Sequence, residues 1–149
     1  MGKITIEIEI YNQNHQAAVR LGCMTYDKIA KMKTNVIVDS GCGHQLILIQ
    51  EDVNKLKINQ IKRTTARLAN GSIANGHIYE PVQLRLVLQH GDSEDHVIHR
   101  DCIVEPVAFE GGNKRLLGVI ALEQMALDLD VTNQRLFPNS GSDIPLYDI

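Results

Sequence analysis

The chain has 149 residues, enough for one domain that buries a sizeable core without a metal or a disulfide. Its formal net charge is -3, so neither nucleic acid nor an anionic membrane is an expected partner. Its apolar runs are far shorter than the roughly 20 residues of a membrane span, no signal peptide is evident, and an odd set of cysteines (Cys23, Cys42 and Cys102) favours reduced thiols, so we expect a cytoplasmic location.

The first half of the chain is dominated by strand signals. Apolar and polar residues alternate over Ile4–Ile10, which predicts a strand with one buried face. Asn35–Val38 and Leu46–Ile49 are apolar on both faces, as strands buried on both sides are. The stretch Tyr11–Lys33 is the least readable and predicts a loop, a strand and a short helix in some order. The segment Glu51–Lys57 begins with acidic residues and ends with lysines, which predicts a short helix.

The second half continues this pattern. The dipeptide Asn70-Gly71 predicts a hairpin turn between strands at Arg63–Leu68 and His77–Leu88. A further strand is predicted over Val97–Val104, after the polar turn Gly91–Asp95. Beyond these lie a short helix at Val119–Leu127, a hairpin formed by 128–131 and 135–137, and an irregular tail from 138. Many short strands with two short helices indicate an all-β barrel or sandwich in a single domain over residues 1–149.

Four sequence segments, in a fixed order along the chain, resemble segments of a known protein family. The segment from Asn35 to Cys42 reads NVIVDSGC, a buried strand that runs into Asp-Ser-Gly. It is followed by the segment Leu46–Leu56, by the turn sequence Leu68–Ser72, and by Leu116-Leu117-Gly118 with an apolar segment after it. Over roughly residues 35–137 the chain therefore resembles the retropepsin-like aspartic proteases, in particular predicted microbial members with a single domain.

This resemblance implies a fold and an activity. The fold would be a retropepsin-like closed β-barrel with one or two short helices, assembled as a homodimer. The activity would be that of an aspartic endopeptidase acting on a peptide or protein substrate, with no cofactor and no metal. The catalytic segment would be Asp39, Ser40 and Gly41. The flap that covers the substrate would be Ala69, Asn70, Gly71 and Ser72.

The chemistry explains why a carboxylate is needed, and why one is too few. Peptide hydrolysis uses a base to activate water and an acid to polarise the carbonyl. Two carboxylates about 3 Å apart repel by roughly 5–6 kcal/mol at an effective dielectric near 20, so one stays protonated while the other is ionised. The chain holds one Asp-Ser-Gly segment, so the pair requires Asp39 from each of two copies. Either Ile4–Ile10 or the tail Ile144–Ile149 is a plausible interface strand.

Some residues depart from the family pattern. Cys42 stands where the family usually has alanine, and Gly43 where it often has a hydroxyl residue. His44 is unusual beside the loop. These departures keep a second hypothesis open: a dimer of the same fold, catalytically weak or inactive, that holds a peptide or a partner without cutting it.

Simpler and different interpretations also exist. Asp39 could merely end a strand in a turn, and Asn70-Gly71 could be an ordinary hairpin turn. Cys42 and His44 suggest a thiol nucleophile, although both fall on a tight loop. A metal site is suggested by a run of possible ligands, although their spacing matches no zinc template. These are His90, Asp92, Asp95, His96, His99, Asp101 and Cys102.

Overall fold

The computed structural model describes residues 4–89, 97–130, 132, 133 and 135–138. Nine strands form one sheet: β1 (Ile4–Asn12), β2 (Lys31–Asp39), β3 (Leu46–Leu48), β4 (Gln60–Arg67), β5 (Ile73–Tyr79), β6 (Val82–Gln89), β7 (Val97–Val104), β8 (Val107–Phe109) and β9 (Leu116–Gly118). A separate pair consists of β10 (Leu127–Asp130) and β11 (Arg135–Pro138). The helical segments are α1 (Gln13–Arg20), the 3-10 helix η1 (Tyr26–Lys28), α2 (Gln50–Leu56) and α3 (Val119–Gln124).

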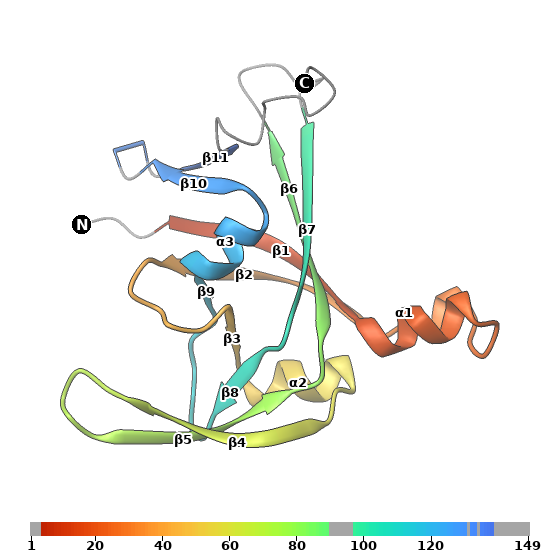
Figure 1. Cartoon of the computed structure of the whole chain (residues 1–149), viewed down its shortest axis with the longest axis horizontal. Coiled ribbons are helices and arrows are strands. Elements are labelled where there is room, and N and C mark those ends of the chain that lie inside the picture. Colours follow the sequence, from red (N-terminus) through yellow and green to blue (C-terminus); the bar gives the residue numbers. More distant parts are fainter. Residues whose placement is uncertain (1–3, 90–96, 131, 134, 139–149) are drawn as a thin grey trace, which may run out of the picture.

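The nine-stranded sheet is curled and open. Its strand order is β4-β5-β8-β3-β9-β2-β1-β6-β7, so β4 and β7 are its edges, and they do not pair with each other in the described part of the chain. Figure 1 shows the β6–β7 pair rising away from the β4–β5 pair. The mostly β fold with few helices is confirmed. The expected closed barrel is instead a half-barrel, because closure requires hydrogen bonds between the two edges.

The core follows from the alternation visible in the sequence. In β1, Ile8 and Ile10 are almost fully buried, whereas Glu7 is exposed. In β6, Leu84 and Leu86 are buried in the same way, and β1 pairs with β6 from Glu9 to Asn12. Each alternating strand thus supplies one apolar face to a core cluster that extends along the chain as far as Leu136 of β11. None of the described helices is long and apolar enough to cross a membrane.

The predicted strand over 77–88 is wrong in one respect. It is divided at Glu80 and Pro81 into β5 and β6, and proline has no N–H to donate to a strand partner. β5 pairs with β4, forming the expected hairpin around Asn70-Gly71. β6 leaves that hairpin and pairs with β1 and β7 instead.

Residues 11–33, whose structure the sequence left open, contain two helical segments at one end of the β1–β2 pair. The two strands remain in register up to Tyr11 opposite Lys31, and the chain between them forms α1 and η1. Asn12 caps α1, because its side-chain oxygen accepts the backbone N–H of His15 at 3.0 Å. Figure 1 shows α1 projecting from the sheet, and none of its residues is buried.

Candidate active site

Asp39 is the last residue of β2 and is half-buried where the strand enters an exposed loop. Its side-chain Oδ1 accepts the backbone N–H of Gly41 at 2.9 Å. Its backbone carbonyl accepts the N–H of Cys42 at 3.1 Å, which closes a turn around Ser40 and Gly41. The carboxylate is thus held by its own loop at the end of a strand anchored in the core. Ser40 is exposed, and no described residue hydrogen-bonds to its side chain.

A third strand determines the width of this loop. β9 lies between β2 and β3, parallel to β2 and antiparallel to β3, so the two strands that flank the loop do not pair with each other. Asp39 is opposite Gly118 in this register, and the Gly118 N–H donates to the carbonyl of Gln45 at 3.0 Å. A Cβ at Gly118 would lie only 2.0 Å from the backbone oxygen of His44, so a side chain at 118 would force the loop to move. The Leu-Leu-Gly motif therefore forms the floor of the Asp39 loop.

A buried ion pair fixes the start of β9 to α2. The Arg115 guanidinium donates to both carboxylate oxygens of Asp52, at 2.7 and 2.8 Å, and the Asp52 side chain is fully buried. Asp52 also accepts the N–H of Ile49 at 3.2 Å, and the Arg115 carbonyl accepts the N–H of Ile37 at 3.0 Å. The hydrogen bonds that Arg115 donates to Asp52 raise the pKa of Arg115. Sequence reasoning missed this pair, because the acids of α2 indicate a helix start and say nothing of a partner far along the chain.

His44 connects the Asp39 loop to the hairpin. Its ring packs edge-on against Phe109 of β8, with centroids 5.7 Å apart. Phe109 is opposite Gly76 of β5, and a Cβ at Gly76 would lie 2.5 Å from the Ala108 carbonyl oxygen. Only glycine allows this close approach. The base of the hairpin and the Asp39 loop are thus joined through one aromatic contact.

The tip of the β4–β5 hairpin is the predicted turn. The Leu68 N–H donates to the Ser72 carbonyl at 2.8 Å, and Gly71 has a φ of 86°, which favours glycine. The side-chain oxygen of Asn70 accepts the N–H of Ser72 at 2.9 Å. Ala69 and the other tip residues are exposed. Figure 1 shows this tip and the β2–β3 loop projecting toward the same side of the molecule, so the turn is confirmed and the flap role stays a prediction.

The hairpin also bears a hollow that sequence reasoning did not find. It has a volume of about 380 Å³ and is lined by polar and charged groups, among them Arg63, Asn75, His77 and Glu110. Arg63 is opposite His77 in the register, and the Glu110 N–H donates to the Asn75 carbonyl at 2.8 Å. The residues come from β4, β5 and the turn after β8, and only the folded sheet brings them together.

The thiol hypothesis does not fit the geometry of Cys42. Its sulfur donates to the backbone oxygen of His44 at 3.4 Å and not to the imidazole. Burial raises the pKa of the Cys42 thiol, and the nearby Asp39 charge raises it further. A nucleophilic cysteine needs the opposite shift, because the thiolate is the reactive form.

The metal hypothesis falls partly outside the described residues. His90, Asp92, Asp95 and His96 lie outside them. Among the remaining three, Asp101 pairs with Arg85 at 2.9 Å, and burial raises the pKa of Cys102 to about 11. Within the part of the chain that the structure describes, no three His, Cys, Asp or Glu side chains gather closely enough to hold a metal ion.

Among the described residues, part of β1 has no strand partner on the side away from β2. β2 covers one side of β1 from Ile4 to Tyr11, but β6 covers the other side only from Glu9 to Asn12. Where β1 and β6 diverge, a hollow of about 210 Å³ is lined by residues that include Ile6, Glu7 and Arg85. Along Ile4–Ile8, β1 thus offers backbone groups to a further strand at the same end of the sheet as Asp39.

Comparison with protein-family models, with curated proteins and with solved structures found no match. The geometry of the chain itself therefore carries the functional argument.

Proposed function

We propose that the chain is one subunit of a homodimeric aspartic endopeptidase, in which Asp39 of each subunit forms half of the catalytic pair. One carboxylate accepts a proton from the attacking water, and the other, protonated, donates to the carbonyl oxygen of the scissile peptide bond. The chemistry requires no metal. The alternative, a dimer of the same fold that binds a peptide without cutting it, is treated below.

The observation that carries the proposal is the way Asp39 is held. A half-buried carboxylate stands at the end of a strand anchored in the core, and its Oδ1 accepts the Gly41 N–H at 2.9 Å. A merely capping aspartate would need only that local bond. Here the loop also lies against Gly118, whose missing side chain leaves room for the His44 carbonyl. A carboxylate at the end of an anchored strand, yet reachable by solvent, suits a general base.

The dimer follows from the single Asp39, because one carboxylate cannot form the pair. The edge of β1 along Ile4–Ile8 does not supply this interface, because two such edges paired with each other would leave the two β2 strands three strand spacings, about 14 Å, apart. The catalytic pair instead requires an interface that brings the two Asp39 loops together at the two-fold axis.

The β4–β5 hairpin suits the role of a flap. Its tip is exposed, and the pairing of β5 with β8 ends at Gly76 opposite Phe109, the residue that His44 contacts. A hairpin held at its base and free at its tip can close over a substrate and exclude water. An extended peptide beneath it would gain main-chain hydrogen bonds, which favour binding with little dependence on side chains.

The binding-only alternative rests on the sparse support around Asp39. Among the described residues, the Asp39 carboxylate accepts one hydrogen bond, from Gly41. The thiol of Cys42 is directed to a carbonyl, and Gly43 has no side chain to add a second bond. A peptide that binds and is released uncut would favour this alternative.

The deciding experiment replaces the carboxylate and keeps its shape. We expect Asp39→Asn to lower cleavage of a peptide library at mildly acidic pH by roughly 10²–10⁴-fold, because the amide can neither accept the proton nor share one. Asp27→Asn, an exposed change on η1 at the other end of the β1–β2 pair, is the matched control and leaves the rate unchanged. Equal cleavage by the wild type and Asp39→Asn would contradict the mechanism.

A further inference from the structure

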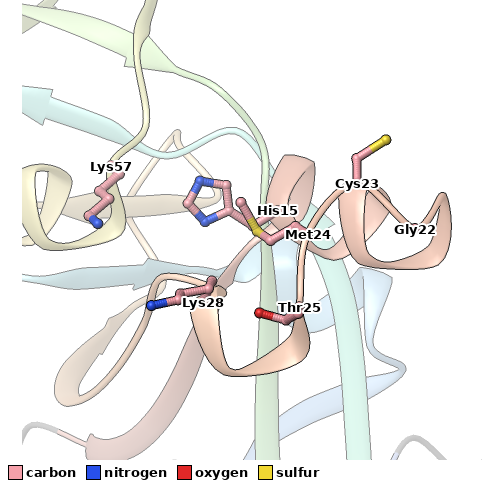
Figure 2. A pocket seen from close by; sticks show the side chains of 7 residues that line it. All are labelled: His15, Gly22, Cys23, Met24, Thr25, Lys28 and Lys57. Atoms are coloured by element: carbon pink, nitrogen blue, oxygen red, sulfur yellow. The ribbon is translucent and has the colours of Figure 1, made fainter.

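A third hollow lies at the end of the β1–β2 pair opposite Asp39. It has a volume of about 610 Å³. It is formed by the segment that contains α1 and η1 and by Lys57, the residue that caps the C-terminal end of α2. Figure 2 shows its lining, which includes His15, Cys23, Met24, Thr25, Lys28 and Lys57. No part of the proposed protease site reaches it, so its role is a separate question.

The polar groups of this hollow are hydrogen-bond donors. His15 Nδ1 accepts the backbone N–H of Ala30 at 3.0 Å, so the ring proton of the neutral imidazole is on Nε2, which is left as a donor. Lys28 and Lys57 add two ammonium groups, and Thr25 adds a hydroxyl. The described lining contains no carboxylate. Such a set of donors is complementary to an anion.

The two lysines are not neutralised by the protein. Among the residues that the structure describes, neither Lys28 nor Lys57 forms an ion pair, whereas Lys33 lies 3.9 Å from the carboxylates of Glu7 and Glu9. The chain as a whole carries a net charge of -3. Two unpaired cations thus line one hollow whose described lining holds no carboxylate, and a bound anion would be their counter-charge.

The backbone beneath the hollow is held in place. Lys57 ends α2 in a left-handed conformation with a φ of 56°. The side-chain amide of Asn12, almost fully buried, donates to the Leu56 carbonyl at 2.8 Å and to the Lys57 carbonyl at 3.4 Å. The same Asn12 caps α1 through His15. One buried side chain thus fixes both walls, which brings His15 and Lys57 to the same hollow before any ligand arrives.

We infer that this hollow binds a phosphate monoester of a small organic molecule. The phosphate dianion takes its hydrogen bonds from Lys28, Lys57 and His15 Nε2. A hollow of about 610 Å³ exceeds the size of a phosphate group and falls within the range of small-molecule sites, so it also accommodates an organic body. That body would lie against Met24 and Cys23.

Calorimetric titration of the full chain with phenyl phosphate, inorganic phosphate and phenol tests this inference. We expect phenyl phosphate to bind more tightly than inorganic phosphate, and phenol not to bind. In the double variant Lys28→Met and Lys57→Met the affinity for phenyl phosphate falls by about tenfold or more, because both charged donors are lost. The matched control, Lys33→Met and Lys55→Met, removes the same charge elsewhere and keeps the wild-type affinity.

Cys23 provides a second readout that does not depend on charge. It is exposed, whereas burial raises the pKa of Cys42 and Cys102, so iodoacetamide reacts first at Cys23. Saturating phenyl phosphate should slow that reaction, as peptide mass spectrometry would show.

Several outcomes would overturn the inference. They are an equal loss of affinity in both double variants, no binding of phenyl phosphate to the wild type, unprotected Cys23, or tighter binding of a phosphoserine peptide than of phenyl phosphate. Asp39→Asn must bind phenyl phosphate as the wild type does, which separates this site from the proposed protease.

Discussion

Glycines decide the geometry around Asp39 as much as the aspartate does. Gly118 leaves room for the carbonyl of His44, and Gly41 supplies the N–H that holds the carboxylate. The sequence shows glycine at both positions, but not which carbonyl each one must accommodate. The position of Asp39 after a buried strand was predictable from the apolar run before it. The contact of His44 with Phe109 was not, because it depends on how β8 is placed beside β3.

Two glycines of this site should differ in how strongly alanine destabilises the fold. We expect Gly118→Ala to lower the free energy of unfolding by about 1–3 kcal/mol, the usual range for overpacking, because its Cβ would lie 2.0 Å from the His44 backbone oxygen. Gly43 has nothing within 4 Å of a built Cβ, so Gly43→Ala should change stability by less than about 0.5 kcal/mol. Urea denaturation measures both, and equal effects would mean that the close approach at Gly118 does not hold.

At the scale of elements, the sequence pattern identifies strands better than it identifies their partners. The alternation in β1 and the Asn70-Gly71 turn depend on local periodicity, which is visible in one dimension. α1 was predicted only as a short helix somewhere within Tyr11–Lys33, because it has no acidic first turn and no buried stripe, and its stability comes from the Asn12 cap and the neighbouring segments. The break at Pro81 was underestimated, although proline marks strand ends.

The Asp52–Arg115 pair predicts a large effect from one surface-accessible side chain. Arg115→Met should destabilise the fold by about 3–5 kcal/mol, because it leaves the fully buried Asp52 carboxylate without its partner. Lys55→Met is the matched control on the same element, since it breaks only the exposed pair with Glu51, at 3.5 Å, and should cost less than about 0.5 kcal/mol. Thermal or urea unfolding would test this, and a loss for Arg115→Met as small as the control's would argue against the buried pair.

For the whole molecule, the proposed function depends on the assembly of two copies. Neither the composition nor the periodicity of the sequence indicates a two-fold axis. The dimer was therefore inferred from the need for a second carboxylate. The open half-barrel was not foreseen, since the closure of a sheet depends on the angles between many short strands.

Mixed dimers test whether each active site draws on both copies. When the wild type and Asp39→Asn are refolded together in equal amounts, we expect activity of about one quarter of that of the same total of wild type, because only wild-type pairs have two carboxylates. Independent active sites would give about one half, and that result would contradict the shared site. Sedimentation at the assay concentration verifies that the chains are dimeric.

The late position of β9 in the sequence also determines when, during synthesis, the Asp39 site can form. β2 and β3 lie early in the chain, but they are joined only through β9, whose residues Leu116–Gly118 come much later. During synthesis the Asp39 loop therefore has no floor until residue 118 has left the ribosome, since pairing between distant segments comes late in folding. A chain that ends before β9 would contain Asp39, but the loop around Asp39 would lack the contacts that hold it in place. If the chain is the proposed protease, it would therefore be inactive as a nascent chain and would not cleave other proteins near the ribosome.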